Sequence, residues 1–92
     1  MLVQFICALI ALSKDLPFET VKPEAREIDS AQLYVFAIRV PTGCVIELYD
    51  DGRFAAGLDG MIECCGRWTS SADLARARHY LITGEKPITK GA

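Results

Sequence analysis

The chain has 92 residues, with 10 basic and 12 acidic side chains and a net charge of −2 at neutral pH. This length corresponds to one small domain. The slightly acidic balance argues against a free-standing nucleic-acid-binding protein, which usually carries an excess of basic residues. Hydrophobic residues make up 51% of the sequence. That share excludes a disordered chain and leaves apolar surface for a partner, because a small domain has little interior.

The first hydrophobic segment, residues 2–13, is apolar on every face. Periodicity does not separate a covered strand from a buried helix in such a segment. Val3, Phe5 and Ile10 favour a strand, which we expect here, with a buried helix as the alternative. The segment is too short to cross a bilayer as a helix, and it lacks the basic start and the cleavage site of a secretory signal.

A polar connector follows over residues 14–32, interrupted by Pro17 and Pro23. Pro23 suits the first position of a helix, and Glu24 in the first turn complements the helix dipole. We therefore expect one or two helical turns over residues 23–31.

Residues 33–66 predict an antiparallel meander. An Asp-Gly pair, Asp51-Gly52, separates two runs rich in β-branched and aromatic residues, which is typical of a tight hairpin with a type I′ turn. A second Asp-Gly pair, Asp59-Gly60, predicts another turn that joins the hairpin to a further antiparallel strand. The expected elements are a strand over 33–40, a turn at 41–43, a hairpin over 44–58, a turn at Asp59-Gly60 and a strand over 61–65.

The last element is predicted to be a helix over residues 70–83. Ser70 and Asp73 have the spacing of a capping box, in which each side chain accepts a hydrogen bond from the other residue's backbone amide. Gly84 is a natural residue to follow the last turn. Residues 85–92 are expected to form a loosely ordered tail.

These elements define the expected fold class, which is α+β. We expect an antiparallel meander of three to five strands packed by one C-terminal helix, in a single domain over residues 1–92.

The cysteines and the only histidine are the one candidate set for metal or nucleophile chemistry: Cys44, Cys64, Cys65 and His79. Structural zinc sites usually take cysteines two to four residues apart. Cys64 and Cys65 are adjacent, so on a strand they point to opposite faces. We expect the cysteines to be small buried hydrophobes in a reducing, cytoplasmic environment, with a cysteine- or zinc-dependent activity as an alternative.

The spacing of the acidic residues and of the glycines argues against a calcium-binding loop and a phosphate-binding loop. Asp50, Asp51 and Asp59 lack the alternating oxygen ligands of a calcium-binding loop. The glycines are scattered and form no phosphate-binding loop. We expect no metal and no cofactor.

A basic and aromatic cluster is the remaining candidate: Arg67, Trp68 and Arg76. Trp and Arg are enriched at the centres of protein interfaces, and they also stack on single-stranded nucleic acid. The net negative charge favours the protein interface. A purely structural alternative places Trp68 beneath the start of the helix.

We therefore expect a small acidic, non-enzymatic protein-binding module that docks on a larger complex and inhibits or adapts it. Its contact residues are expected to be Asp50, Asp51, Asp59, Arg67, Trp68 and Arg76. In size, acidity and compactness the chain is similar in type to small phage or mobile-element proteins, including anti-CRISPR-type inhibitors. Single-stranded nucleic-acid binding through Arg67, Trp68 and Arg76 stays open, as does a homodimer formed through an unpaired sheet edge.

Overall fold

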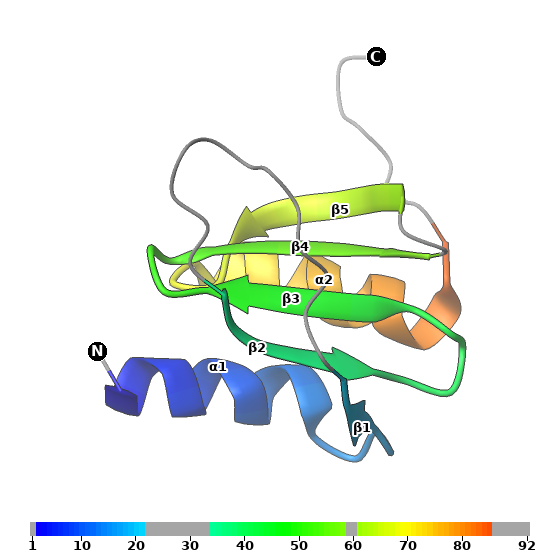
Figure 1. Ribbon diagram of the computed structural model, residues 1–92, viewed down its shortest axis with the longest axis horizontal. Helices are drawn as coiled ribbons and strands as arrows, with labels where there is room; N and C mark the ends of the chain where they lie inside the picture. Colours follow the sequence, from blue (N-terminus) through cyan, green and yellow to red (C-terminus); the bar gives the residue numbers. More distant parts are fainter. Residues whose placement is uncertain (1, 22–33, 59–60, 86–92) are drawn as a thin grey trace.

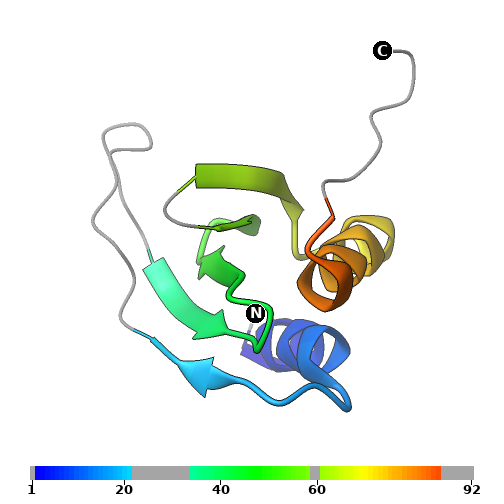
Figure 2. The same cartoon turned by 90° about the vertical axis from the view of Figure 1, so that its right-hand side faces the viewer.

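The computed structural model describes residues 2–21, 34–58 and 61–85 of the chain. Its elements, in chain order, are α1 (Leu2–Ser13), β1 (Glu19–Thr20), β2 (Tyr34–Arg39), β3 (Val45–Tyr49), β4 (Arg53–Leu58), β5 (Met61–Arg67) and α2 (Ser71–Thr83). The five strands form one antiparallel sheet in the order β1-β2-β3-β4-β5. Both helices lie side by side against one face of this sheet (Figures 1 and 2). The α+β class and the meander are confirmed.

The core lies between the sheet and the two helices. In each central strand every second side chain faces the helices, as the pleat of a strand requires. Ile46 and Leu48 on β3 face inward together with Phe54 and Ala56 on β4. The helices contribute Ala8 and Leu12 from α1 and Ala77, Tyr80 and Leu81 from α2.

The expectation that residues 2–13 form a strand is wrong, because the segment is the helix α1. Its inward side chains are Phe5, Ala8, Leu9 and Leu12, which follow helical spacing and reach the core. The edge position next to β2 is taken instead by the two-residue strand β1. The helix has no basic residue in its last turn, and the guanidinium of Arg78 on α2 donates to the Leu12 carbonyl at 3.1 Å. This cation at the C-terminal end of α1 complements the helix dipole.

The hairpin of β3 and β4 is confirmed, but its turn lies one residue earlier than expected. The Gly52 amide donates to the Tyr49 carbonyl at 3.1 Å, so Asp50 and Asp51 are the central residues. Gly52 follows them with φ of +95°, whereas Asp51 does not have a positive φ. A turn followed by a left-handed glycine is the usual geometry of a slightly longer hairpin loop. The type I′ expectation is therefore wrong.

The second hairpin contains a bulge. Ala56 pairs with Cys64 and Gly57 pairs with Ile62, so Glu63 is one extra residue on β5. The bulge directs Glu63 toward the helices, where its carboxylate accepts a hydrogen bond from the Tyr80 hydroxyl at 2.8 Å. Leu58 pairs with Met61 on either side of the expected turn. Asp59 and Gly60 themselves, the expected helix over 23–31 and nearly all of the expected tail lie outside the described residues.

Helix α2 begins at Ser71, one residue after the predicted start, and ends at Thr83 as predicted. The Ser70 hydroxyl accepts from the Asp73 amide at 3.3 Å, and the Gly84 amide donates to the Tyr80 carbonyl with φ of +70°. The capping box is only half formed, because the Asp73 carboxylate accepts from the Arg67 amide rather than from that of Ser70. The helix start is thereby joined to the end of β5.

Candidate partner-binding surface

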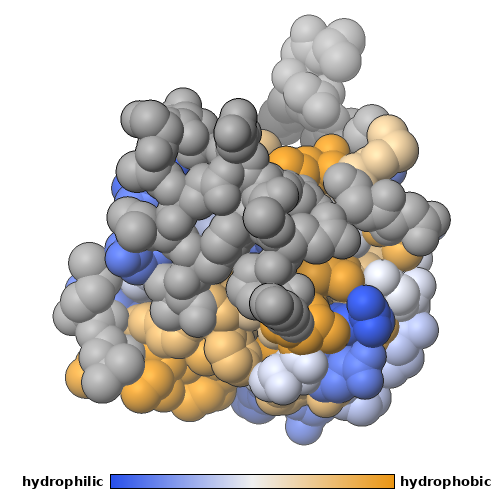
Figure 3. Space-filling view, viewed as in Figure 1, coloured by the Kyte–Doolittle hydropathy of each residue, from blue (hydrophilic) through white to orange (hydrophobic). Residues whose placement is uncertain are grey.

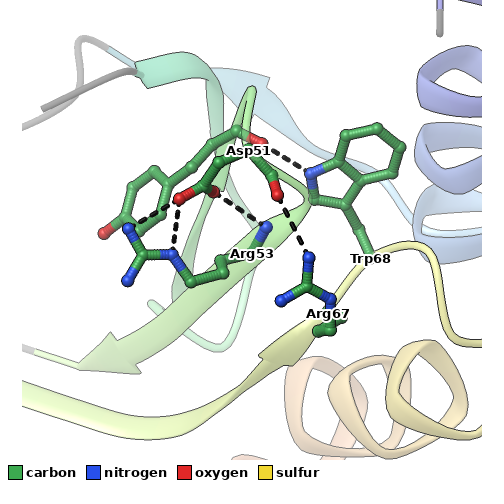
Figure 4. Close-up of polar contacts among 5 residues, drawn as sticks. Asp51, Arg53, Arg67 and Trp68 are labelled. Carbon is green, nitrogen blue, oxygen red and sulfur yellow. Dashed lines mark hydrogen bonds and ion pairs between the residues drawn. The ribbon is translucent and has the colours of Figure 1, made fainter. Parts of the chain in front are cut away.

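One end of the molecule gathers most of the charged residues that the sequence selects. Asp51 lies in the turn between β3 and β4, and its carboxylate accepts from the amide of Arg53 at 3.1 Å and from its Nε at 2.7 Å (Figure 4). A second guanidinium nitrogen of Arg53 lies 2.6 Å from the carboxylate. These hydrogen bonds hold the pKa of Asp51 below its usual value. Asp50, the neighbouring turn residue, is exposed.

Arg67 connects this turn to the start of α2. Its guanidinium donates to the Asp51 carbonyl at 3.2 Å (Figure 4). Its amide donates to the Asp73 carboxylate at 2.9 Å, and Asp73 also forms an ion pair with Arg76. The structure therefore brings Asp51, Arg67 and Arg76 onto one surface, and it adds Arg53 and Asp73, which the sequence analysis did not select. We call these five residues the charged end.

Replacing Asp73 by asparagine tests how much the charge stabilises this end. The Arg67 amide, followed by Arg76, lowers the pKa of Asp73 in the folded protein. Its ionised form therefore stabilises the fold above the unfolded-state value of 3.8, and this contribution is lost as the pH falls below it. We expect Asp73→Asn to cost about 1 kcal/mol in urea unfolding at pH 7. The difference in stability between the two proteins should shrink as the pH falls below 3.8, and a difference that does not change with pH would contradict the assignment.

Trp68 belongs to the core and not to the contact surface. Its side chain is only 2% exposed. The indole Nε1 donates to the Tyr49 carbonyl at 2.6 Å, as Figure 4 shows, and the ring packs edge-on against Phe5 with centroids 5.7 Å apart. The structural alternative for Trp68 is therefore the correct one, and a stacking role for its ring is not compatible with this burial.

The cysteines and His79 are spread over different environments. Cys44 and Cys64 are buried in the core, whereas Cys65 is exposed on the opposite face of the sheet, as strand alternation predicts. His79 is exposed on α2. In residues 2–21, 34–58 and 61–85, no three histidine, cysteine or acidic side chains are close enough to hold a metal ion. Burial also raises the pKa of Cys64, the opposite of what an activated thiol requires.

The buried polar groups serve the fold. The Tyr80 hydroxyl is held by Glu63 and lies beside Cys44, and burial together with these neighbours raises the pKa of Tyr80 well above its usual value. On the other face of the sheet, the buried carboxylate of Glu47 accepts from the Tyr49 hydroxyl at 3.3 Å. In the described part of the chain, no buried side-chain nitrogen or oxygen lacks a partner.

A shallow groove of about 410 Å³ lies beside β1. Its charged residues, Glu19 and Arg39, are paired with each other at 2.9 Å. The remaining lining residues are Pro17, Phe18, Val40, Pro41 and Gly43. The two charges of the groove therefore already neutralise each other.

Exposed apolar side chains are the feature that the sequence analysis did not locate. They gather on the outer side of α1 and at the β4–β5 hairpin. Figure 3 shows apolar surface along the lower left, over the position of α1, and again at the upper right. Among the residues whose side chains the structure describes, the large exposed apolar ones are Val3, Ile6, Ile10, Phe18, Leu58, Met61, Ile62 and Ile82. The exposure of the side chains at the β4–β5 hairpin could not be predicted from the sequence, because it depends on which strand lies at the edge of the sheet.

The outer edge of β5 combines exposed side chains with backbone groups that pair with no other strand of the described residues. β5 is the last strand in the sheet order, and no strand lies beyond it among the described residues. The Trp68 amide donates toward β4, to Gly52, whereas the Arg67 amide points outward to Asp73. In an antiparallel ladder this direction alternates, so the Cys65 amide and carbonyl also face outward.

Comparisons with protein-family models, with curated protein sequences and with solved structures found no match for this chain. None of the helices in the described residues has the length and apolar character needed to span a bilayer. What the chain does must therefore be argued from its own surface.

Proposed function

We propose that this chain is a small non-enzymatic protein-binding module that docks on a larger complex and inhibits or adapts it. The observation that carries the proposal is the outer edge of β5, an edge strand that presents exposed apolar side chains. Met61, at the start of this strand, is 69% exposed, and Ile62 beside it is also exposed. Edge strands with free backbone groups accept an extended segment of another protein by strand addition.

The geometry of the edge supports a protein strand as the occupant. Backbone hydrogen bonds at Cys65 would supply affinity, and the exposed side chains of Met61 and Ile62 would supply specificity. The Asp73 carboxylate already occupies the outward amide of Arg67. The added strand would therefore stop before the charged end, whose residues would form the polar rim of the interface.

The proposed location is the cytoplasm. All four cysteines are free thiols, which suits a reducing compartment. The type of activity is that of the phage and mobile-element inhibitors whose size and acidity this chain shares. Single-stranded nucleic-acid binding has less support, because Trp68 is buried. A cysteine- or zinc-dependent activity also has less support, because the cysteines are dispersed.

The test is affinity capture from the native cell extract with the wild-type protein, two β5 variants and one control variant, followed by mass spectrometry. Met61→Glu places a charge on the proposed interface, and Cys65→Pro removes an outward amide without removing a ladder hydrogen bond. Val3→Glu on α1 is the matched control, because Val3 is as exposed as Met61. Thermal melts establish that each variant is folded.

We expect one large complex to be recovered with the wild type and with Val3→Glu, and to be lost with both β5 variants. If the complex were lost with Val3→Glu but still recovered with the β5 variants, the partner-binding site would not lie on β5. Recovery of no complex would contradict the proposed function itself.

A further inference from the structure

The outer face of α1 is a second apolar surface, distant in sequence from β5 and free of charge. Val3 is 72% exposed, Ile6 45% and Ile10 58%. Cys7 lies between them and is also exposed. The helix contains no charged residue from Leu2 to Ser13.

The fold does not require this apolar face. The inner side of α1 supplies the core contacts through Phe5, Ala8, Leu9 and Leu12. Polar residues at the outer positions would leave these contacts unchanged and would give the amphipathic pattern of an ordinary surface helix. Contiguous exposed apolar side chains on a small protein usually mark a contact surface.

The spacing of the stripe is self-complementary. Positions 3, 6, 7 and 10 are symmetric about the point between Ile6 and Cys7. Two antiparallel copies of the helix, related by a twofold axis through that point, would place Val3 against Ile10 of the second copy and Ile6 against Cys7 of the second copy. A closed, isologous interface of this kind is the commonest arrangement of soluble homodimers.

We propose that two copies of this chain associate through the outer face of α1, packed antiparallel. The lack of charge favours a second copy, because a different partner usually gains its specificity from complementary charges and this face presents none. The symmetric spacing favours it again, since Val3 meets the aliphatic Ile10 of the second copy and Ile6 meets the smaller Cys7. This inference concerns α1 alone and does not rest on partner binding at β5.

The size of the face sets the strength of the association. The exposed parts of Val3, Ile6 and Ile10 together equal less than two whole aliphatic side chains. The interface therefore belongs to the small class, below about 1,200 Å² in total, that is typical of transient complexes. We expect a reversible dimer whose population rises with concentration over the micromolar range.

Sedimentation velocity over a concentration series measures this association directly. The wild type is expected to shift from monomer to dimer as the concentration rises. Val3→Glu with Ile10→Glu puts like charges against each other and should weaken the dimer about tenfold or more. Met61→Glu, an equally exposed position on β5, is the matched control and should dimerise as the wild type does. Far-UV circular dichroism and Trp68 fluorescence report whether each variant is folded.

Charge exchange tests the antiparallel orientation. Val3→Lys combined with Ile10→Glu places opposite charges against each other in an antiparallel pair and like charges in a parallel one. We expect this variant to keep the dimer that the doubly acidic variant loses. Mixing the doubly acidic variant with its doubly basic counterpart, Val3→Lys with Ile10→Lys, should restore a mixed dimer.

Three results would overturn the proposal. The first is a wild-type protein that stays monomeric up to millimolar concentration. The second is a dimer lost with Met61→Glu and kept with the doubly acidic variant, which would place self-association on the sheet edge. The third is binding of the wild type, through Val3 and Ile10, to phosphatidylcholine and phosphatidylserine vesicles without any dimer, which would make the occupant a lipid surface.

Discussion

Replacing Gly57 by alanine is expected to destabilise the protein by about 3 kcal/mol or more, because the added methyl group has no space. A Cβ atom at this position would lie 1.7 Å from the backbone carbonyl oxygen of Met61. Gly57 pairs with Ile62 directly beside the bulge, so the backbone of β5 has to move away. The change in the free energy of unfolding can be measured by urea denaturation.

Gly84→Ala is the matched control for this substitution. Gly84 has φ of +70°, but no neighbouring side chain or strand of the described residues lies within 4 Å of the position that a Cβ would take. Its cost comes from backbone conformation alone, about 1–2 kcal/mol. A Gly57→Ala protein that is as stable as Gly84→Ala would contradict the register of the β4–β5 hairpin.

Replacing Trp68 by alanine is expected to cost about 3–5 kcal/mol, since the largest side chain of the core would be removed. Trp68 joins three parts of the fold, because it follows β5, donates to the last residue of β3 and packs against Phe5 on α1. The loss should be measured by denaturation followed with far-UV circular dichroism, because the substitution removes the only tryptophan.

Trp68→Phe separates packing from hydrogen bonding at this position. Phenylalanine keeps an aromatic ring against Phe5 but removes the donor to the Tyr49 carbonyl, which should cost about 1–3 kcal/mol. If Trp68→Ala cost less than about 1 kcal/mol, Trp68 would not be a core residue, and its role as a contact residue would have to be reconsidered.

Local signals predict much of this fold. The bounds of α2 follow from Ser70 and Gly84, whose capping roles need no information from the rest of the chain. The hairpin at Asp51-Gly52 and the opposite orientations of Cys64 and Cys65 also follow from short-range rules. The exact turn is less predictable, because an Asp-Asp-Gly sequence fits either of two registers and the strand pairing decides between them.

The N-terminal segment shows where local reasoning fails. Residues 2–13 have no polar face and no caps, so their sequence does not choose between helix and strand. Two distant contacts favour the helix in the folded protein: the packing of Phe5 against Trp68, and the hydrogen bond from Arg78 to the Leu12 carbonyl. Neither is visible without the tertiary structure.

The candidate surface is predicted in part. The sequence selected the charged residues Asp51, Arg67 and Arg76, which the structure brings to one end of the molecule. It could not show that these charges are already paired within the chain, or that Trp68 is buried. The exposed edge of β5 depends on strand order, which a single sequence does not determine.

The central claim is that the outer edge of β5 receives a strand from a protein partner. Amide hydrogen exchange of the chain, alone and in its captured complex, tests this most directly. We expect exchange in the complex to slow over residues 61–65, with the amide of Cys65 among those protected, and to stay unchanged over residues 18–20. Unchanged exchange along β5, with protection appearing elsewhere, would contradict it.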